Sequence, residues 1–189
     1  MPEVKTRVLI GGAGVIGSIY TVKFIEVGID VTIFTRSDRL KALQENGLQY
    51  NEKVAVKSIK VNVIGTLGNE DIYGFIFVPV RYDQSESALL ALKSNKSRNI
   101  VTMANNSAGF SAWPDIVGDR LLPTFPGAGG QIKDGILYAR FSPVPSHCSC
   151  RAAYMQGCAS VIQLFSALLI SRQHNIRSVV VAEYIIAGY

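Results

Sequence analysis

The sequence is poor in cysteine and histidine and has no hydrophobic run long enough to cross a membrane. Its three cysteines, an odd number, all lie in the last quarter of the chain: Cys148, Cys150 and Cys158. We therefore expect no disulfide framework and a reducing, cytoplasmic location. The longest apolar stretch, residues 157–170, contains Gln163 and falls short of the roughly 20 residues that span a bilayer. We therefore expect no membrane partner.

Charges of one sign do not cluster along the chain. Although the net charge is +5, lysine and arginine are scattered and form none of the runs that are typical of a nucleic-acid-binding arm. Nucleic acid is therefore not an expected partner, and the charge indicates only a weak affinity for phosphate groups. The group His147, Cys148, Cys150 and Cys158 lacks the paired spacing of a zinc knuckle, so no metal site is predicted.

Strand-like and helix-like segments alternate through most of the sequence. The 189 residues are 48% hydrophobic and 17% charged, which suits one α/β domain with a small appendage. This alternation predicts a Rossmann-type doubly wound parallel sheet. The expected strands are 7–10, 30–35, 75–80, 99–104 and 121–125, with extended segments and a hairpin at 54–65 and a loop at 126–130; the expected helices are 15–27, 38–45 (capped by Ser37) and 84–93.

The character of the chain changes after residue 142. We expect residues 1–142 to form the nucleotide-binding Rossmann domain and residues 143–189 to form a short, partly helical tail. Residues 158–171 have helical periodicity, and the last apolar residues end abruptly. We interpret the tail as the start of a truncated C-terminal helical domain, although a natural edge strand or packed helix is an alternative. Its apolar surface favours self-association into a homo-oligomer.

A glycine motif, G-x-G-x-x-G, joins the first expected strand to the first expected helix. Its residues are Gly12, Ala13, Gly14, Val15, Ile16 and Gly17. The first glycine permits a tight turn, the second lets a pyrophosphate approach the backbone, and the third lets the helix pack closely on the strand. The helix N-terminus adds unpaired N–H groups that attract an anion, so the motif predicts a dinucleotide-binding site.

Arg36 follows the second expected strand, where the residue beside the adenosine ribose distinguishes NAD from NADP. An acidic residue would bind the free 2′-hydroxyl, whereas arginine pairs with a 2′-phosphate; Asp30 is no substitute, because it lies roughly 16 Å away along the strand. Arg36 therefore predicts NADP, with a preference on the order of tenfold to a hundredfold. Arg39 and Lys41 either add to the positive field or are solvated residues of a helix face.

Four segments together resemble the N-terminal domain of the ketopantoate reductase (2-dehydropantoate 2-reductase) family: residues 12–17, 34–36, 78–84 and 101–106. The likeness runs from about residue 7 to residue 142. It implies an oxidoreductase that uses NADPH to reduce a small-molecule 2-keto acid in pantothenate biosynthesis.

The resemblance also implies two residues near the nicotinamide half of the cofactor, a lysine after the fourth strand and an asparagine after the fifth. This chain has Arg81 in place of the lysine and keeps Asn105. Arginine preserves the positive charge but is fixed as a cation, so a role that needs proton exchange is not expected there. The alternatives are an exposed arginine at a strand end and a turn formed by Asn105 and Asn106.

In the family that the chain resembles, a lysine from a C-terminal helical domain assists the reduction. This chain has no lysine after Lys133, so its catalytic residues are unknown. We expect the chain to bind NADPH but to reduce ketopantoate poorly or not at all. Two alternatives stay open: another NADP-dependent Rossmann dehydrogenase, and an NADP-binding sensing domain without turnover.

Overall fold

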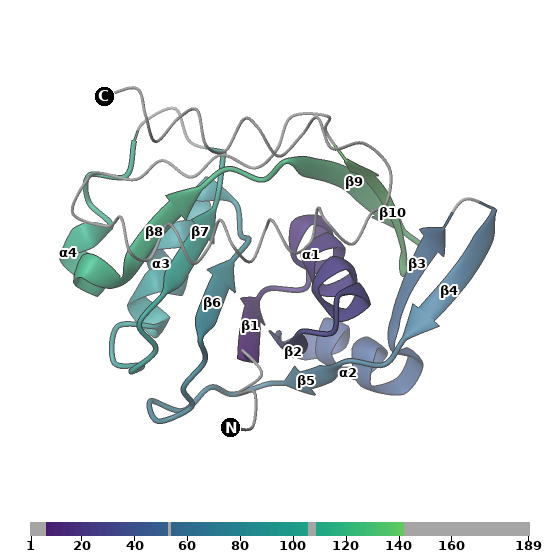
Figure 1. Ribbon diagram of the computed structural model, residues 1–189, viewed down its shortest axis with the longest axis horizontal. Helices are drawn as coiled ribbons and strands as arrows, with labels where there is room; N and C mark the ends of the chain where they lie inside the picture. Colours follow the sequence, from purple (N-terminus) through teal and green to yellow (C-terminus); the bar gives the residue numbers. More distant parts are fainter. Residues whose placement is uncertain (1–6, 53, 106–108, 142–189) are drawn as a thin grey trace.

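The computed structural model describes residues 7–52, 54–105 and 109–141, which form two sheets and the helices that pack on them (Figure 1). The larger sheet has six strands in the order β5-β2-β1-β6-β7-β8, and every neighbouring pair is parallel. Its strands are β1 (Arg7–Gly11), β2 (Asp30–Phe34), β5 (Asn62–Ile64), β6 (Phe75–Val78), β7 (Ile100–Met103) and β8 (Leu121–Thr124). This arrangement confirms the predicted Rossmann-type α/β sheet.

The helices lie in the connections between these parallel strands. They are α1 (Val15–Glu26), α2 (Ser37–Asn46), α3 (Tyr82–Ala91), α4 (Pro114–Val117) and the short 3-10 helix η1 (Gly118–Arg120). The predicted N-cap of α2 is wrong. Arg36 occupies the N-cap position, and Ser37 is the first helical residue with a φ of 54°, so its hydroxyl does not close the helix end.

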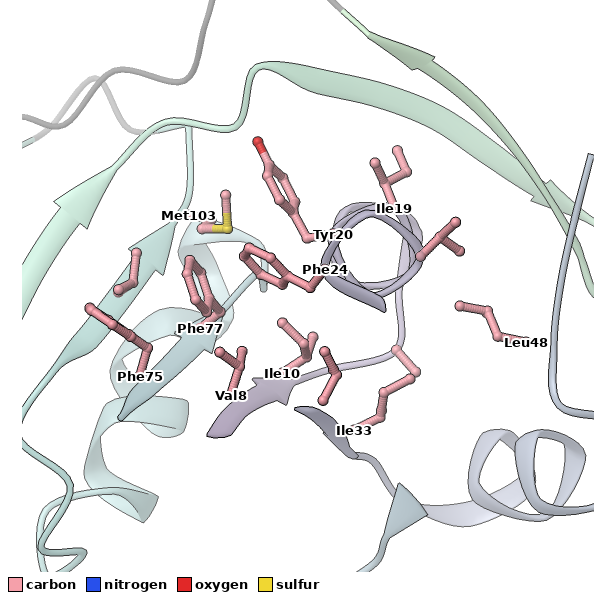
Figure 2. Close-up of a cluster of buried hydrophobic side chains, with 14 of the residues drawn as sticks. Val8, Ile10, Ile19, Tyr20, Phe24, Ile33, Leu48, Phe75, Phe77 and Met103 are labelled. Atoms are coloured by element: carbon pink, nitrogen blue, oxygen red, sulfur yellow. The ribbon is translucent and has the colours of Figure 1, made fainter. Parts of the chain in front are cut away.

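Both faces of the larger sheet are covered, which explains why a central strand such as β6 is apolar throughout. Along β6, Phe75 and Phe77 belong to the core on the α1 face, whereas Ile76 and Val78 belong to a second core with residues of α3 and α4. Figure 2 shows the first core, where the ring of Phe24 from α1 packs on Phe77 with centroids 5.1 Å apart. The two cores hold the carboxyl ends of the strands in fixed positions.

The smaller sheet differs from the sequence prediction. Its order is β4-β3-β10-β9, with β3 (Leu48–Glu52), β4 (Ala55–Ile59), β9 (Ala128–Lys133) and β10 (Ile136–Phe141). The extended segments expected within 54–65 are confirmed as β4 and β5, but they do not form a hairpin, because β4 pairs with β3 while β5 joins the larger sheet beside β2. The loop expected at 126–130 is also wrong from residue 128 onward, because β9 pairs antiparallel with β10 and both strands contact α1 (Figure 1).

The larger sheet has its topological switch point between β1 and β6. From β1 the chain passes through α1 to β2 on one side, and it returns on the other side of β1 through β6. Open α/β sheets bind ligands outside the carboxyl ends of the strands at such a point. The expected tail, residues 143–189, lies outside the described residues together with its cysteines.

Candidate nucleotide-binding site

The glycine motif forms the connection between β1 and α1, at the carboxyl edge of the sheet. Gly12 has a φ of 140°, which L side chains rarely adopt. Gly14 is the N-cap of α1, has no side-chain capping bond, and is followed by a first turn without an acidic residue. Val15 and Ile16 begin the helix and are partly buried against the core. The first N–H groups of α1 therefore have no side-chain acceptor, as an anion site at a helix N-terminus requires.

Gly14 and Gly17 have opposite surroundings. A Cβ atom on Gly17 would lie 1.9 Å from the carbonyl oxygen of Gly12, so only glycine lets α1 pack this closely on the turn. A Cβ atom on Gly14 would meet nothing within 4 Å, and Gly14 is exposed. The fold itself therefore requires Gly17 but not Gly14, and the space beside Gly14 is open to a ligand.

Arg36 lies beside this turn. In the register of β1 and β2, Gly11 is the partner of Phe34, so the two strands end side by side at the same edge. The Arg36 guanidinium is over the Phe34 ring, 5.4 Å from its centroid, and the residue is exposed. At the far end of the same strands Asp30 is the partner of Arg7 and forms an ion pair with it, 3.8 Å from Nε to Oδ2. Asp30 is thus remote from the glycine turn.

Arg81 and Asn105 follow the neighbouring strands β6 and β7, in which Val78 is the partner of Thr102. Both Arg81 and Asn105 are exposed. The Arg81 guanidinium donates two hydrogen bonds to Asp83, 3.0 Å from Nε to Oδ1 and 2.6 Å from Nη2 to Oδ2. The hydrogen bonds and the opposite charge raise the pKa of Arg81, and the same hydrogen bonds lower the pKa of Asp83. Arg81 is therefore a permanent cation whose fork is engaged by a carboxylate.

The connections after β1 and β6 meet at this edge. A Cβ atom on Gly12 would lie 3.5 Å from Cγ1 of Val80, which places the segment before Arg81 against the glycine turn. Within the described part of the chain, no hydrogen bond joins Arg81 or Asn105 to residues 12–17. The structure thus brings the predicted residues to one edge of the sheet without direct contacts among all of them.

Arg39 is a residue of this site to which the sequence analysis assigned no definite role. It lies in the first turn of α2, and its Nε donates to the carbonyl oxygen of Ala13 at 3.3 Å. The Ser18 hydroxyl donates to the same oxygen, also at 3.3 Å. Burial lowers the pKa of Arg39, and its Nη2 is buried without a hydrogen-bond partner among the described residues. The only sequence signal was its proximity to Arg36.

Among residues 7–52, 54–105 and 109–141, no group of three or more His, Cys, Asp and Glu side chains could hold a metal ion. His147 and the three cysteines lie outside those ranges. No helix in the same ranges is both long and apolar enough to cross a membrane.

A six-stranded parallel sheet with a glycine turn at its switch point defines a Rossmann-like α/β fold with the motif of dinucleotide-binding proteins. A model of the family "Ketopantoate reductase PanE/ApbA" matches residues 8–112, more than half of the chain. The chain therefore belongs to the ketopantoate reductase PanE/ApbA family. The matched region includes the glycine motif, Arg36, Arg81 and Asn105.

Solved structures share the fold at low sequence identity. D-mandelate dehydrogenase, solved with NADH and anilino(oxo)acetate, is 17% identical with a TM-score of 0.70; the match covers 86% of this chain and 54% of that one. A PanE/ApbA family ketopantoate reductase from Ralstonia eutropha JMP134 is 16% identical with a TM-score of 0.69 and the same coverages, 86% and 54%. The chain thus spans about half the length of these structures. No curated protein sequence matches it.

Proposed function

We propose that the chain is the coenzyme-binding part of an NADPH-dependent reductase of a 2-keto acid, of the ketopantoate reductase type. Arg36 carries the choice of NADPH, because it follows β2 at the point where β2 ends beside the glycine turn after β1. Membership of the ketopantoate reductase family supports the reaction class. The NADH in the D-mandelate dehydrogenase structure supports a nicotinamide coenzyme.

The residues present fit such a coenzyme. The open space beside Gly14 and the uncapped N-terminus of α1 would receive the pyrophosphate. Arg36 would pair with the 2′-phosphate, and Arg81 and Asn105, at the ends of β6 and β7, would lie toward the nicotinamide. Bound NADPH would supply a hydride to the keto carbon. The chain's own contribution is to bind and orient the hydride donor; no proton donor is assigned.

The choice between NADPH and NADH is tested with Arg36→Ala. We expect the Kd for NADPH to rise on the order of tenfold to a hundredfold, and the Kd for NADH to stay within about twofold, because only NADPH carries the 2′-phosphate. Fluorescence titration of both coenzymes measures the two constants. Arg98→Ala is the matched control, since Arg98 is exposed and precedes β7 at the opposite edge of the sheet.

Three results would contradict the proposal. If neither coenzyme binds the parent protein, the nucleotide site itself is wrong. If the parent binds NADPH and Arg36→Ala leaves that Kd unchanged, the site stands but Arg36 does not select the coenzyme. If Arg98→Ala raises the Kd for NADPH as much as Arg36→Ala does, the effect comes from the loss of overall positive charge and not from a contact of Arg36.

A further inference from the structure

Arg39 connects two segments that are distant in the sequence but adjacent at the coenzyme edge. It belongs to the first turn of α2, and its Nε donates to the carbonyl oxygen of Ala13, 26 residues earlier, at 3.3 Å. Ala13 is buried and lies between the first two glycines of the motif. One nitrogen of the guanidinium therefore holds the glycine turn against the start of α2.

The Nη2 atom of the Arg39 guanidinium is not accounted for by the described residues. Nη2 is buried and has no hydrogen-bond partner among the described residues, and none of their carboxylates forms an ion pair with Arg39. A buried N–H group of a cation without an acceptor is costly, so folded proteins rarely leave one. The described residues supply no acceptor for Nη2, and a phosphate oxygen is the acceptor that suits a guanidinium best.

The position of Arg39 indicates which phosphate. Arg36 and Arg39 both belong to the segment that follows β2, which lies beside the adenosine ribose in this topology, whereas the pyrophosphate is expected at the N-terminus of α1. Arg36 is exposed and Arg39 is partly buried, so water and salt screen Arg39 less. The two side chains differ in this way although they are only three residues apart.

We propose that Arg39 is a second specificity-determining arginine, which ties the glycine turn to α2 through Nε and offers Nη2 to the 2′-phosphate of NADPH. This inference rests on the proposed function, because it requires NADPH to bind over residues 12–17. It assigns a divided role to one side chain: Nε positions the turn that receives the pyrophosphate, and Nη2 recognises the group that distinguishes NADPH from NADH. Lys41, on the same helix, has no such contact with the turn in the described structure.

The test measures the ratio of the Kd values for NADH and NADPH in Arg39→Met, which keeps a long side chain but removes the charge and all the guanidinium N–H donors. We expect the Kd for NADPH to rise about tenfold or more and the Kd for NADH to rise much less, so that the ratio falls. Arg39→Lys keeps the charge but has one nitrogen that cannot serve both acceptors, so its ratio should lie between those of the parent and Arg39→Met. Lys41→Met, which removes a charge from the same helix, should keep the parental ratio.

A merely structural role for Arg39 would give a different pattern. If Arg39 only braces the turn, Arg39→Met weakens NADPH and NADH equally and the ratio does not move, which overturns the proposal. An equal fall of the ratio in Lys41→Met also overturns it, because a general field would then explain the effect. Should Arg39→Met unfold, the ratio in Arg39→Lys decides, and a parental ratio there overturns the proposal. If the parent protein binds neither coenzyme, the proposed function itself is wrong.

Discussion

Gly14 and Gly17 lie in one turn, yet a methyl group meets open space at the first and a backbone oxygen at the second. Gly17→Ala would place its Cβ 1.9 Å from the Gly12 oxygen, so we expect a loss of about 1–3 kcal/mol of stability through overpacking. Gly14 has a φ of −73°, which alanine adopts readily, and an added Cβ atom would meet nothing within 4 Å. The stability of Gly14→Ala should therefore match that of the parent. Its Kd for NADPH should nevertheless rise roughly tenfold or more, because the methyl group occupies the approach of the pyrophosphate.

Thermal unfolding and NADPH titration of the two variants check this pair, and each variant serves as the control for the other. A Gly14→Ala protein that binds NADPH like the parent would show that no phosphate approaches the turn at this residue. A Gly17→Ala protein as stable as the parent would show that the helix can move away from the turn at little cost.

The motif spacing alone predicted the separate roles of these glycines, because each role follows from backbone geometry at a fixed offset. Arg39 could not be assigned in the same way. Its hydrogen bond to Ala13 depends on how far a long side chain reaches across a packed interface, which no local pattern encodes. The pairing of Arg81 with Asp83 was missed for a related reason. Arg81 is the N-cap of α3 and Asp83 lies in its first turn, and residues two apart on a helix are not expected to face each other.

The segment that follows α3 is held by one arginine at the end of η1. The Arg120 guanidinium donates to backbone carbonyl oxygens of residues 92, 93, 95, 97 and 117. Arg120→Ala would leave several of these acceptors without a partner, so we expect it to lower the free energy of unfolding by roughly 1.5–3 kcal/mol. Arg120→Lys, with a single ammonium group, should restore only part of this loss.

Urea denaturation measures the effect as a lower midpoint with an unchanged slope. The Kd for NADPH should stay at the parental value, because Arg120 precedes β8 and lies at the edge of the sheet opposite the glycine turn. A parental midpoint in Arg120→Ala would mean that water replaces the guanidinium at these carbonyls. Loss of NADPH affinity in a folded Arg120→Ala protein would contradict the separation of the two edges.

Among the secondary-structure elements, the parallel strands were predictable and the smaller sheet was not. The four residues of β6 are all buried, and such a run indicates a strand covered on both faces. In contrast, β3 has the sequence LQYNE, which contains no β-branched residue. The sequence of β9, AGGQIK, contains two consecutive glycines, which are unfavourable in a strand. Their sheet is completed by pairing between Leu137 and Tyr50, which are far apart in the chain, so the larger topology had to be known first.

At the scale of the whole molecule, the described residues contain a six-stranded sheet with its switch point, and the chain spans about half the length of the solved relatives. The sheet, its two cores and the glycine turn are the parts on which the proposed nucleotide binding depends.

We expect this polypeptide to bind NADPH without reducing ketopantoate at an appreciable rate. Saturating NADPH should raise its thermal midpoint, since a ligand at a hundredfold excess over its Kd stabilises the native state by about 2.7 kcal/mol. Turnover should be absent, because the resemblance to ketopantoate reductases implies a lysine from a C-terminal domain and this chain has none after Lys133. The loss of NADPH absorbance with ketopantoate measures the rate, with a family member of full length as the positive control.

Rapid NADPH oxidation that depends on ketopantoate would show that another group of this chain, such as one of its histidines, delivers the proton. Stabilisation by NADPH with no oxidation in a screen of 2-keto acids would favour a nucleotide-binding role without turnover.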